Sequence, residues 1–310
     1  MKKLGIIGCG QIATHHLETL RFVGFEIEYV ASSKGSKTIS LFAKKNAIKN
    51  YFVDPNELIQ KSNLLDGLVL SCPTSEMIDY LKILRKFNKP ILIEKPISYN
   101  YKLLNPFINK QNIMVGLNRR YYETIIFAKK FIKSNKRILI KVSLPESFKK
   151  LNSKNFGYDY NYSENTFENS IHIFDILYFL VGDISWKYKT LKAHNGNVKY
   201  FVGIGRSINR DIDIILDNYY QSSSNFSIEI LSDSQKLILK PLEVAYLYDG
   251  MNVSFNDKTN SRIYEPKLIK IIEENNSFKP GFLKQSKTFM QFFKESHSGV
   301  PKIADMRKSL

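Results

Sequence analysis

Cysteine, tryptophan and long apolar runs are all scarce in this 310-residue chain. Only two cysteines occur, Cys9 and Cys72, and neither lies in a CxxC or metal-ligand spacing, so we expect no disulfide framework and no metal site. No window holds the ~18 consecutive apolar residues that a membrane-spanning helix requires. The apolar stretch after Lys3 is shorter than the ~7–15 residues of a signal-peptide core, so we expect a cytoplasmic protein.

Acidic residues are scarce relative to basic ones. The 29 Asp and Glu face 46 Lys and Arg, which gives a formal net charge of +17. Among the basic residues 37 are Lys and 9 are Arg, whereas sequence-specific nucleic-acid binders depend on the bidentate contacts of Arg. We therefore expect a solvated, lysine-rich surface and no nucleic-acid partner. The charge leaves two alternatives open: a phosphate-bearing substrate, or a nucleic acid bound along a continuous basic stripe.

Short apolar runs alternate with amphipathic stretches over the first 120 residues, which is typical of βαβ units. The predicted strands are Leu4–Gly8, Phe25–Ala31, Leu68–Ser71, Ile91–Glu94 and Ile113–Leu117. The predicted helices are Gln11–Arg21, Lys37–Lys44, Pro55–Lys61, Ser75–Phe87 and Tyr99–Ile108. Asp54 precedes Pro55 at one helix start, and Ser98 is the expected N-cap of the last helix. We therefore predict a doubly wound parallel sheet of the α/β class, in a domain of residues 1–120.

The pattern changes after residue 120. A predicted helix at 123–134 leads into a strand at 137–144, and a polar, aromatic loop then precedes an apolar helix at 167–181. Residues 185–265 alternate with period two, which indicates antiparallel strands, and an amphipathic helix follows at about 282–295. We predict a second domain, residues 121–310, of the α+β type with a mainly antiparallel sheet, which binds the substrate and mediates oligomerisation.

A glycine-rich turn joins the first predicted strand to the first predicted helix. Residues 8–13 read GCGQIA, a GxGxxA pattern. The first glycine allows a tight turn, the second lets a pyrophosphate approach the backbone, and the small third residue lets helix and strand pack closely. The free N–H groups of the helix then face the phosphate. The residues predicted to bind the dinucleotide here are Gly8, Gly10, Gln11 and Ile12.

The end of the second predicted strand indicates which dinucleotide binds. An NAD site usually has an acidic residue there to bind the ribose 2′-hydroxyl, but this strand runs into Ser32, Ser33 and Lys34, and Glu26 and Glu28 lie too early. Two hydroxyls and an ammonium suit a 2′-phosphate through charge-assisted hydrogen bonds. We expect NADP as the cofactor, with NAD possible if this segment is only a solvated turn.

Glu94-Lys95-Pro96 follows a predicted strand at the carboxyl edge of the sheet, where doubly wound folds bind ligands. A lysine at this edge can give or take the proton that accompanies hydride transfer at a carbinol carbon, provided that its ammonium is destabilised. Taken alone, one lysine among 37 is more simply a surface residue.

Four segments occur along the chain in this order: residues 8–13 with His16, Ser71-Cys72-Pro73-Thr74, Glu94–Ser98, and Gly116–Tyr121. Together they resemble the Gfo/Idh/MocA family of sugar and cyclitol dehydrogenases. The resemblance implies a Rossmann domain that binds NAD(P), with Cys72, Pro73, Glu94 and Lys95 at the cofactor and Arg120 and Tyr121 at the substrate. It also implies a homo-oligomer formed through the open face of the second sheet.

A second-domain segment, ENSIHIFD at residues 168–175, is similar to the family's D-x-x-x-H-x-x-D helix. A spacing of four residues puts Glu168 and His172 on one helix face. By resemblance, Lys95 and His172 transfer the proton and bind the substrate hydroxyl, Glu168 replaces the family's first Asp, and Asn169 contacts the substrate. The chain departs from the family in having Met77 where a histidine is usual and in its short C-terminal end.

The leading hypothesis is an NAD(P)-dependent oxidoreductase that acts on a hydroxyl or keto carbon of a sugar or sugar-nucleotide-like substrate. The alternative is a regulatory or scaffold protein of the same fold that binds cofactor without turnover. Other motifs are weaker: we expect packing or solvent exposure for His15-His16, and a β-bulge at Gly203-Ile204-Gly205. The aromatic loop at 158–162 either covers a sugar or is a surface excursion.

Overall fold

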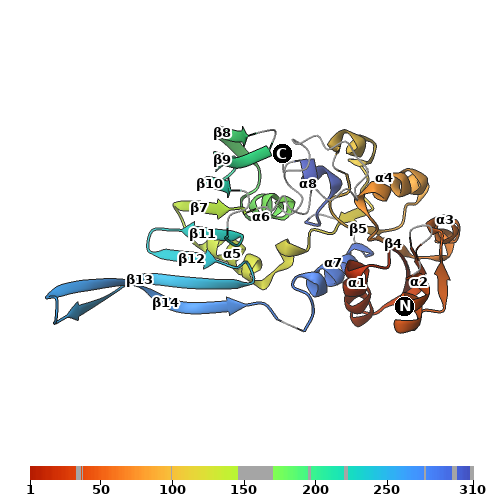
Figure 1. The fold of residues 1–310 in the computed structure, drawn as a ribbon, viewed down its shortest axis with the longest axis horizontal. Coiled ribbons are helices and arrows are strands. Elements are labelled where there is room, and N and C mark those ends of the chain that lie inside the picture. The colour runs from red at the N-terminus through yellow and green to blue at the C-terminus, as the bar shows by residue number, and fades with distance from the viewer. Residues whose placement is uncertain are drawn as a thin grey trace. The chain divides into compact units, whose positions relative to one another are not determined.

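A computed structural model describes residues 1–32, 36, 38–98, 100–145, 170–194, 197–219, 223–275, 277–294 and 299–307. The chain folds into two compact units (Figure 1): unit 1 is Met1–Tyr121 with Asn276–Leu310, and unit 2 is Tyr122–Asn275. The C-terminal helices, which the sequence analysis placed in the second domain, thus pack with unit 1. The division into cofactor and substrate domains at residue 120 stays a prediction.

Unit 1 contains a six-stranded, all-parallel sheet in the order β3-β2-β1-β4-β5-β6. Its strands are β1 Lys2–Ile7, β2 Phe25–Ala31, β3 Asn50–Phe52, β4 Gly67–Leu70, β5 Ile91–Ile93 and β6 Ile113–Val115. This is the strand order of a dinucleotide-binding Rossmann fold, so the predicted fold class is confirmed. The short, largely exposed β3 was not predicted, because three residues without a buried face carry no periodic signal.

Helices cover both faces of this sheet. They are α1 Gln11–Phe22, α2 Ile39–Lys45, α3 Pro55–Gln60, α4 Thr74–Ile83, α7 Phe282–Phe292 and α8 Ile303–Arg307. The hydroxyls of Thr19 in α1 and Ser286 in α7 share a buried hydrogen bond of 2.8 Å, and Phe289 of α7 lies in the core with Leu4 and Ile6 of β1. This packing explains why α7 belongs to unit 1. No helix in the described ranges is long and apolar enough to cross a membrane.

Two predicted helix starts have different outcomes. Asp54 caps α3 by accepting a hydrogen bond from Asn56 N at 2.9 Å, as the Asp-Pro start predicts. The prediction for Ser98 is wrong. The element that follows is a 3₁₀ helix, η3 Tyr101–Phe107, and Asn100 caps it, whereas the Ser98 hydroxyl bonds to the backbone of Asn100. The Ser98 hydroxyl is therefore hydrogen-bonded within the turn before the helix and not to the first N–H groups of the helix.

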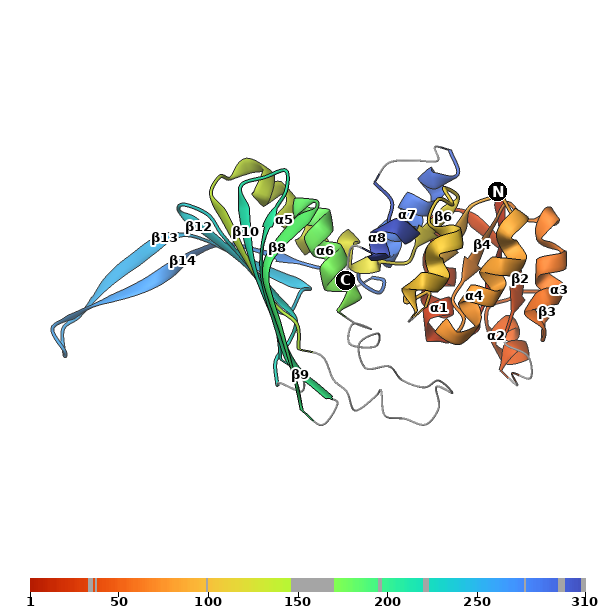
Figure 2. The same ribbon diagram turned by 90° about the horizontal axis from the view of Figure 1, so that it is seen from above.

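Unit 2 contains an eight-stranded sheet in the order β14-β13-β12-β11-β7-β10-β9-β8. Its strands are β7 Ile138–Ser143, β8 Ile184–His194, β9 Asn197–Ser207, β10 Ile212–Tyr219, β11 Ser227–Leu231, β12 Gln235–Leu239, β13 Val244–Asn256 and β14 Ser261–Glu273. Neighbours are antiparallel except β7 and β10, so the predicted mainly antiparallel sheet is confirmed. Helices α5 Glu123–Ser134 and α6 Ile171–Val181 cover one face of it (Figure 2) and share its apolar core.

The predicted bulge also lies in this sheet. The register between β8 and β9 shifts where Trp186 pairs with Gly205 and Tyr188 pairs with Ile204. A Cβ at Gly205 would lie 2.8 Å from the Trp186 ring, so the glycine makes room for the indole. The register shift at Ile204 and Gly205 therefore agrees with the expected β-bulge, and Gly205 serves packing against Trp186.

Strands β13 and β14 continue as a two-stranded ribbon beyond the end of β12 (Figure 1). On one face of the ribbon Met251, Val253 and Phe255 alternate along β13, and Tyr264 of β14 pairs with Val253. These four side chains are 53–58% exposed. The residues between them on β13, such as Asn252 and Ser254, are polar. The ribbon therefore has one mainly apolar exposed face and one mainly polar face, on which Ile263 pairs with Ser254.

Candidate active site

The glycine-rich turn between β1 and α1 requires its first glycine for two reasons. Gly8 has φ +119°, a conformation that residues with a Cβ rarely adopt, and a Cβ there would lie 2.4 Å from the backbone oxygen of Ser71. The Gly8 N–H also donates to the Ala31 carbonyl at 2.8 Å. The turn is thus held between the carboxyl ends of β2 and β4.

The second glycine opens the amino end of α1. A Cβ on Gly10 would meet no atom within 4 Å, and Gln11 beside it is exposed. Helix α1 has no side-chain cap and no acidic residue in its first turn, so its first N–H groups are open to an anion. Ala13, one turn into the helix, is fully buried, as close packing of helix and sheet requires. These features fit a dinucleotide pyrophosphate.

The end of β2 is described only in part. Ser32 is buried, and its N–H donates to the Phe52 carbonyl at 3.2 Å. Glu28 is ion-paired with Lys3 at 3.1 Å, which fits the expectation that it lies too early to reach a ribose. Ser33 and Lys34 lie outside the described residues, so the preference for NADP stays a prediction.

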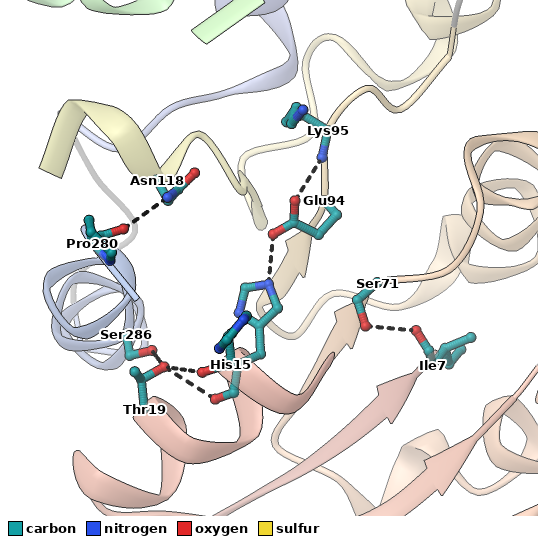
Figure 3. A network of polar contacts seen from close by, with 10 residues as sticks. Ile7, His15, Thr19, Ser71, Glu94, Lys95, Asn118, Pro280 and Ser286 are labelled. Atoms are coloured by element: carbon teal, nitrogen blue, oxygen red, sulfur yellow. Dashed lines mark hydrogen bonds and ion pairs between the residues drawn. The ribbon is translucent and has the colours of Figure 1, made fainter. Parts of the chain in front are cut away.

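Glu94 follows β5 and is the centre of a polar network (Figure 3). Its Oε1 lies 2.7 Å from Nε2 of His16, and its Oε2 accepts a hydrogen bond from the Lys95 N–H at 3.3 Å. The His16 side chain is fully buried and that of Glu94 is 12% exposed. The expectation of packing or solvent for His16 is therefore incomplete. The residue is buried, but its imidazole binds the carboxylate next to Lys95.

Three further groups from unit 1 surround this pair. A Cβ at Gly116 would lie 2.7 Å from Glu94 Oε1, so this glycine leaves room for the carboxylate. The Phe282 ring packs 5.0 Å from the His16 ring. Burial lowers the pKa of Lys279; the charge of Glu94 opposes this and that of Arg119 adds to it.

The loop after β4 lies between the glycine-rich turn and Glu94, because β4 separates β1 from β5. Cys72 is 7% exposed, and burial raises the pKa of its thiol to about 12. The thiol is therefore protonated at neutral pH and is no nucleophile. Pro73 is exposed at the start of α4, and Met77, at the position of the family's histidine, is buried.

The predicted substrate residues lie in both units. In unit 1 Arg120 is buried and Tyr121 half-buried at the end of the 3₁₀ helix η4 Asn118–Tyr121. In unit 2 His172 is buried on α6. Glu168 and Asn169, like the aromatic loop at 158–162, lie outside the described residues. That Lys95 and His172 act on one substrate stays a prediction.

Sequence reasoning missed the partnership of His16 with Glu94 and the place of Lys279 near it. The 78 residues that separate His16 from Glu94 leave no local spacing to detect. The sequence did hold one signal for His16, its position three residues after the GxGxxA pattern on the helix that follows.

Comparison with known proteins agrees with this geometry. The sequence model of the Gfo/Idh/MocA group, described as an oxidoreductase family with an NAD-binding Rossmann fold, matches residues 2–108. Myo-inositol 2-dehydrogenase of Thermotoga maritima is 27% identical over 124 residues, which cover 38% of this chain and 37% of that enzyme. The chain thus aligns with little more than a third of this curated relative.

Solved structures of low identity share the whole fold. A dehydrogenase from Clostridium difficile superposes with a TM-score of 0.74 at 18% identity, over 99% of this chain and 96% of that one. Levoglucosan dehydrogenase in complex with NADH gives a TM-score of 0.75 at 13% identity, over 100% and 94%. The match of residues 2–108 to the NAD-binding Rossmann model of the Gfo/Idh/MocA oxidoreductases confirms the resemblance over this segment, and the solved structures confirm the fold of the whole chain.

Proposed function

We propose that the protein is an NAD(P)-dependent dehydrogenase or reductase that acts on a hydroxyl or keto carbon of a sugar or sugar-nucleotide-like substrate. One observation carries this proposal. The glycine-rich turn after β1 and Glu94-Lys95 after β5 lie at the same carboxyl edge of one parallel sheet, two strands apart. A dinucleotide bound at the turn can therefore extend across that edge toward Lys95.

The cofactor, when bound, supplies or accepts the hydride. Gly8 and Gly10 let its pyrophosphate approach the amino end of α1, where Gln11 and Ile12 offer backbone N–H groups. Cys72, Pro73 and Glu94 would hold the nicotinamide end of the cofactor. The residues that favour a 2′-phosphate, and so NADP over NAD, are Ser32, Ser33 and Lys34.

Lys95 handles the proton of the substrate oxygen. In the oxidising direction the amine of Lys95 would accept the O–H proton of the substrate. In the reducing direction the Lys95 ammonium returns that proton to the forming alkoxide. His172 and Glu168 bind and orient the reacting hydroxyl, and Arg120, Tyr121 and Asn169 hold the rest of the substrate.

The substrate class is supported by the relatives. One is named for myo-inositol and another for levoglucosan, and both names denote polyhydroxylated rings. The net charge of +17 further favours a substrate that carries phosphate. We therefore propose a ring polyol or sugar, free or nucleotide-linked.

We further propose that the chain forms a homo-oligomer through the open face of the unit 2 sheet. Helices α5 and α6 cover the opposite face, and the apolar face of the β13–β14 ribbon exposes Val253, Phe255 and Tyr264. A two-stranded ribbon is marginally stable alone in water, and a contiguous exposed apolar patch is typical of an interface. A second copy of the chain is the partner that covers this face.

The first test is a titration with NADPH and with NADH, followed by nicotinamide fluorescence. We expect micromolar binding of NADPH by the wild-type protein. Lys34→Ala should weaken NADPH binding about tenfold and spare NADH, because one charge-assisted contact to the 2′-phosphate is lost. Lys45→Ala, at an exposed lysine in the last turn of α2, is the matched control. Failure of both nucleotides to bind would overturn the proposed function.

The second test is turnover with myo-inositol, levoglucosan and a panel of sugar nucleotides, followed by nicotinamide absorbance. Activity that disappears in Lys95→Ala supports the dehydrogenase. Tight nucleotide binding without turnover of any ring polyol or keto sugar would instead favour the regulatory or scaffold protein of the same fold.

A further inference from the structure

His16 has no assigned role, yet its imidazole lies between the cofactor-binding helix and the residue next to Lys95. It projects from α1, whose amino end receives the pyrophosphate, and its Nε2 is 2.7 Å from Glu94 Oε1. The other oxygen of the same carboxylate accepts the Lys95 N–H at 3.3 Å. A single carboxylate thus joins α1 to the backbone of Lys95 (Figure 3).

The surroundings of His16 determine which nitrogen carries the hydrogen. The side chain is fully buried, and its Nδ1 has no hydrogen-bond partner among the described residues. A buried N–H without an acceptor is more costly than a buried lone pair without a donor, so the hydrogen belongs on Nε2. His16 therefore donates its Nε2–H to the carboxylate of Glu94.

Neighbouring groups restrict the carboxylate and the imidazole in other directions. The Glu94 carboxylate lies against Gly116, where no Cβ fits, and the Phe282 ring packs on the imidazole at 5.0 Å. The Glu94 N–H donates to the Leu70 carbonyl at 2.8 Å, which extends the ladder between β4 and β5 by one residue. These contacts leave the Glu94 carboxylate few conformations, and the hydrogen bond from His16 stabilises one of them.

We propose that His16 is a positioning residue for Lys95: its Nε2–H fixes the Glu94 carboxylate, which fixes the Lys95 backbone relative to the cofactor-binding helix. This role rests on the proposed function, in which the Lys95 amine meets the substrate oxygen. Misplacement of a reacting group by about 1 Å can lower a rate about 100-fold, so a hydrogen bond that sets this spacing affects turnover more than binding.

A purely structural role for His16 is the competing explanation. Helix α1 is already fastened to α7 by the buried hydrogen bond between Thr19 and Ser286 and by apolar packing. If the His16 hydrogen bond only stabilised the packing of α1, a variant that lacks it would lose activity only as far as the protein loses thermal stability. The two roles therefore differ in whether turnover and thermal stability change together.

The test compares three single variants of the full-length protein. His16→Phe keeps a ring against Phe282 but removes the donor, and His16→Gln restores an N–H at a similar reach. His15→Phe makes the same chemical change one residue earlier, at a side chain that is 25% exposed and pairs with Glu18 instead. Each is assayed for kcat, KM, NADPH affinity and melting temperature.

We expect kcat of His16→Phe to fall about 10–100-fold, with KM and NADPH affinity changed less than threefold. His16→Gln should recover most of this loss, and His15→Phe should retain wild-type kcat. A fall in kcat that tracks melting temperature across all three variants, or no recovery in a stably folded His16→Gln, would overturn the proposal.

A measurement without substrate separates this proposal from the proposed function. Hydrogen exchange of the Lys95 amide, followed by NMR, should be about fivefold faster in His16→Phe than in the wild type, because a net hydrogen bond of about 1 kcal/mol is weakened. It should be unchanged in His15→Phe. If the protein binds no nucleotide but this exchange difference appears, the proposed function fails while the His16–Glu94–Lys95 linkage stands. Equal exchange rates would show that His16 does not position Lys95.

Discussion

The two sheets of this protein treat their faces differently. In unit 1 every residue of β4, β5 and β6 is buried, because helices cover both faces of the parallel sheet. In unit 2 helices cover one face of the antiparallel sheet, and residues 250–255 of β13 are all exposed. A sheet that helices cover on both faces can bind ligands only at the ends of its strands. A sheet that helices cover on one face leaves its other face available to a partner.

This difference explains where chemistry is expected. The polar groups of unit 1 that we connect with function follow β1, β4 and β5 at one edge, and its faces are apolar. Most of the exposed large apolar residues of unit 2 lie instead on β13 and β14. Our proposals therefore place hydride transfer at the strand ends of the unit 1 sheet and self-association on the uncovered face of the unit 2 sheet.

The largest effect is expected from Lys95, at the edge of the closed sheet. Lys95→Ala should lower kcat about 10²–10⁴-fold, because a positioned proton donor or acceptor is lost, while NADPH affinity stays near that of the wild type. Lys102→Ala, at an exposed lysine seven residues later, is the control and should retain kcat. A near-normal kcat in Lys95→Ala would contradict the proposed role of Lys95 as the proton donor or acceptor.

The second effect concerns the two glycines at the same edge. Gly8→Ala should lower the free energy of unfolding by about 2–4 kcal/mol, because its Cβ combines a positive φ with a close contact to Ser71. Gly10→Ala should leave stability within about 0.5 kcal/mol, since its Cβ meets open space. Urea unfolding of the two variants measures the difference. Equal destabilisation would contradict the geometry of the turn.

The third effect concerns the face of the open sheet. Val253→Lys puts a charge on the mainly apolar face of the β13–β14 ribbon, and Ser254→Lys puts the same charge on its mainly polar face. If a second copy covers the apolar face, Val253→Lys should raise the dimer Kd about 10–100-fold, since a buried unpaired charge is costly, and Ser254→Lys should leave it unchanged. Light scattering during gel filtration measures the mass. A wild-type monomer, or a dimer that survives Val253→Lys, would end this assignment.

Much of the closed sheet could be predicted from sequence because its signals are local. The bounds of β2 and of α5 are as predicted, and the glycine turn lies where its motif places it. The open sheet was predicted only as a class. The parallel pairing of β7 with β10 joins segments about 75 residues apart, and no alternation of apolar residues encodes a partner strand.

The site shows the same limit. Each motif predicts where the backbone turns or a strand ends, because these features depend on the types of neighbouring residues. Side-chain partners between motifs, such as His16 with Glu94, depend on how helices pack on the sheet, and that packing is set by many distant apolar contacts.

The smallest effect distinguishes the two cysteines beside the closed sheet. Burial disfavours the Cys72 thiolate and raises its pKa to about 12 from a usual 9.0, whereas Cys9 is partly exposed and lies 3.4 Å from the Thr38 hydroxyl. Iodoacetamide at pH 8, followed by mass spectrometry, should label Cys9 and leave Cys72 largely unmodified.

The same burial of Cys72 predicts a pH dependence of stability. Since the unfolded chain loses the Cys72 proton at lower pH than the folded chain, this residue should lower the free energy of unfolding as pH rises from about 9 toward 12. Removing the thiol in Cys72→Ala should flatten that part of the stability profile, and rapid labelling of Cys72 in the folded protein would show that the loop after β4 is open.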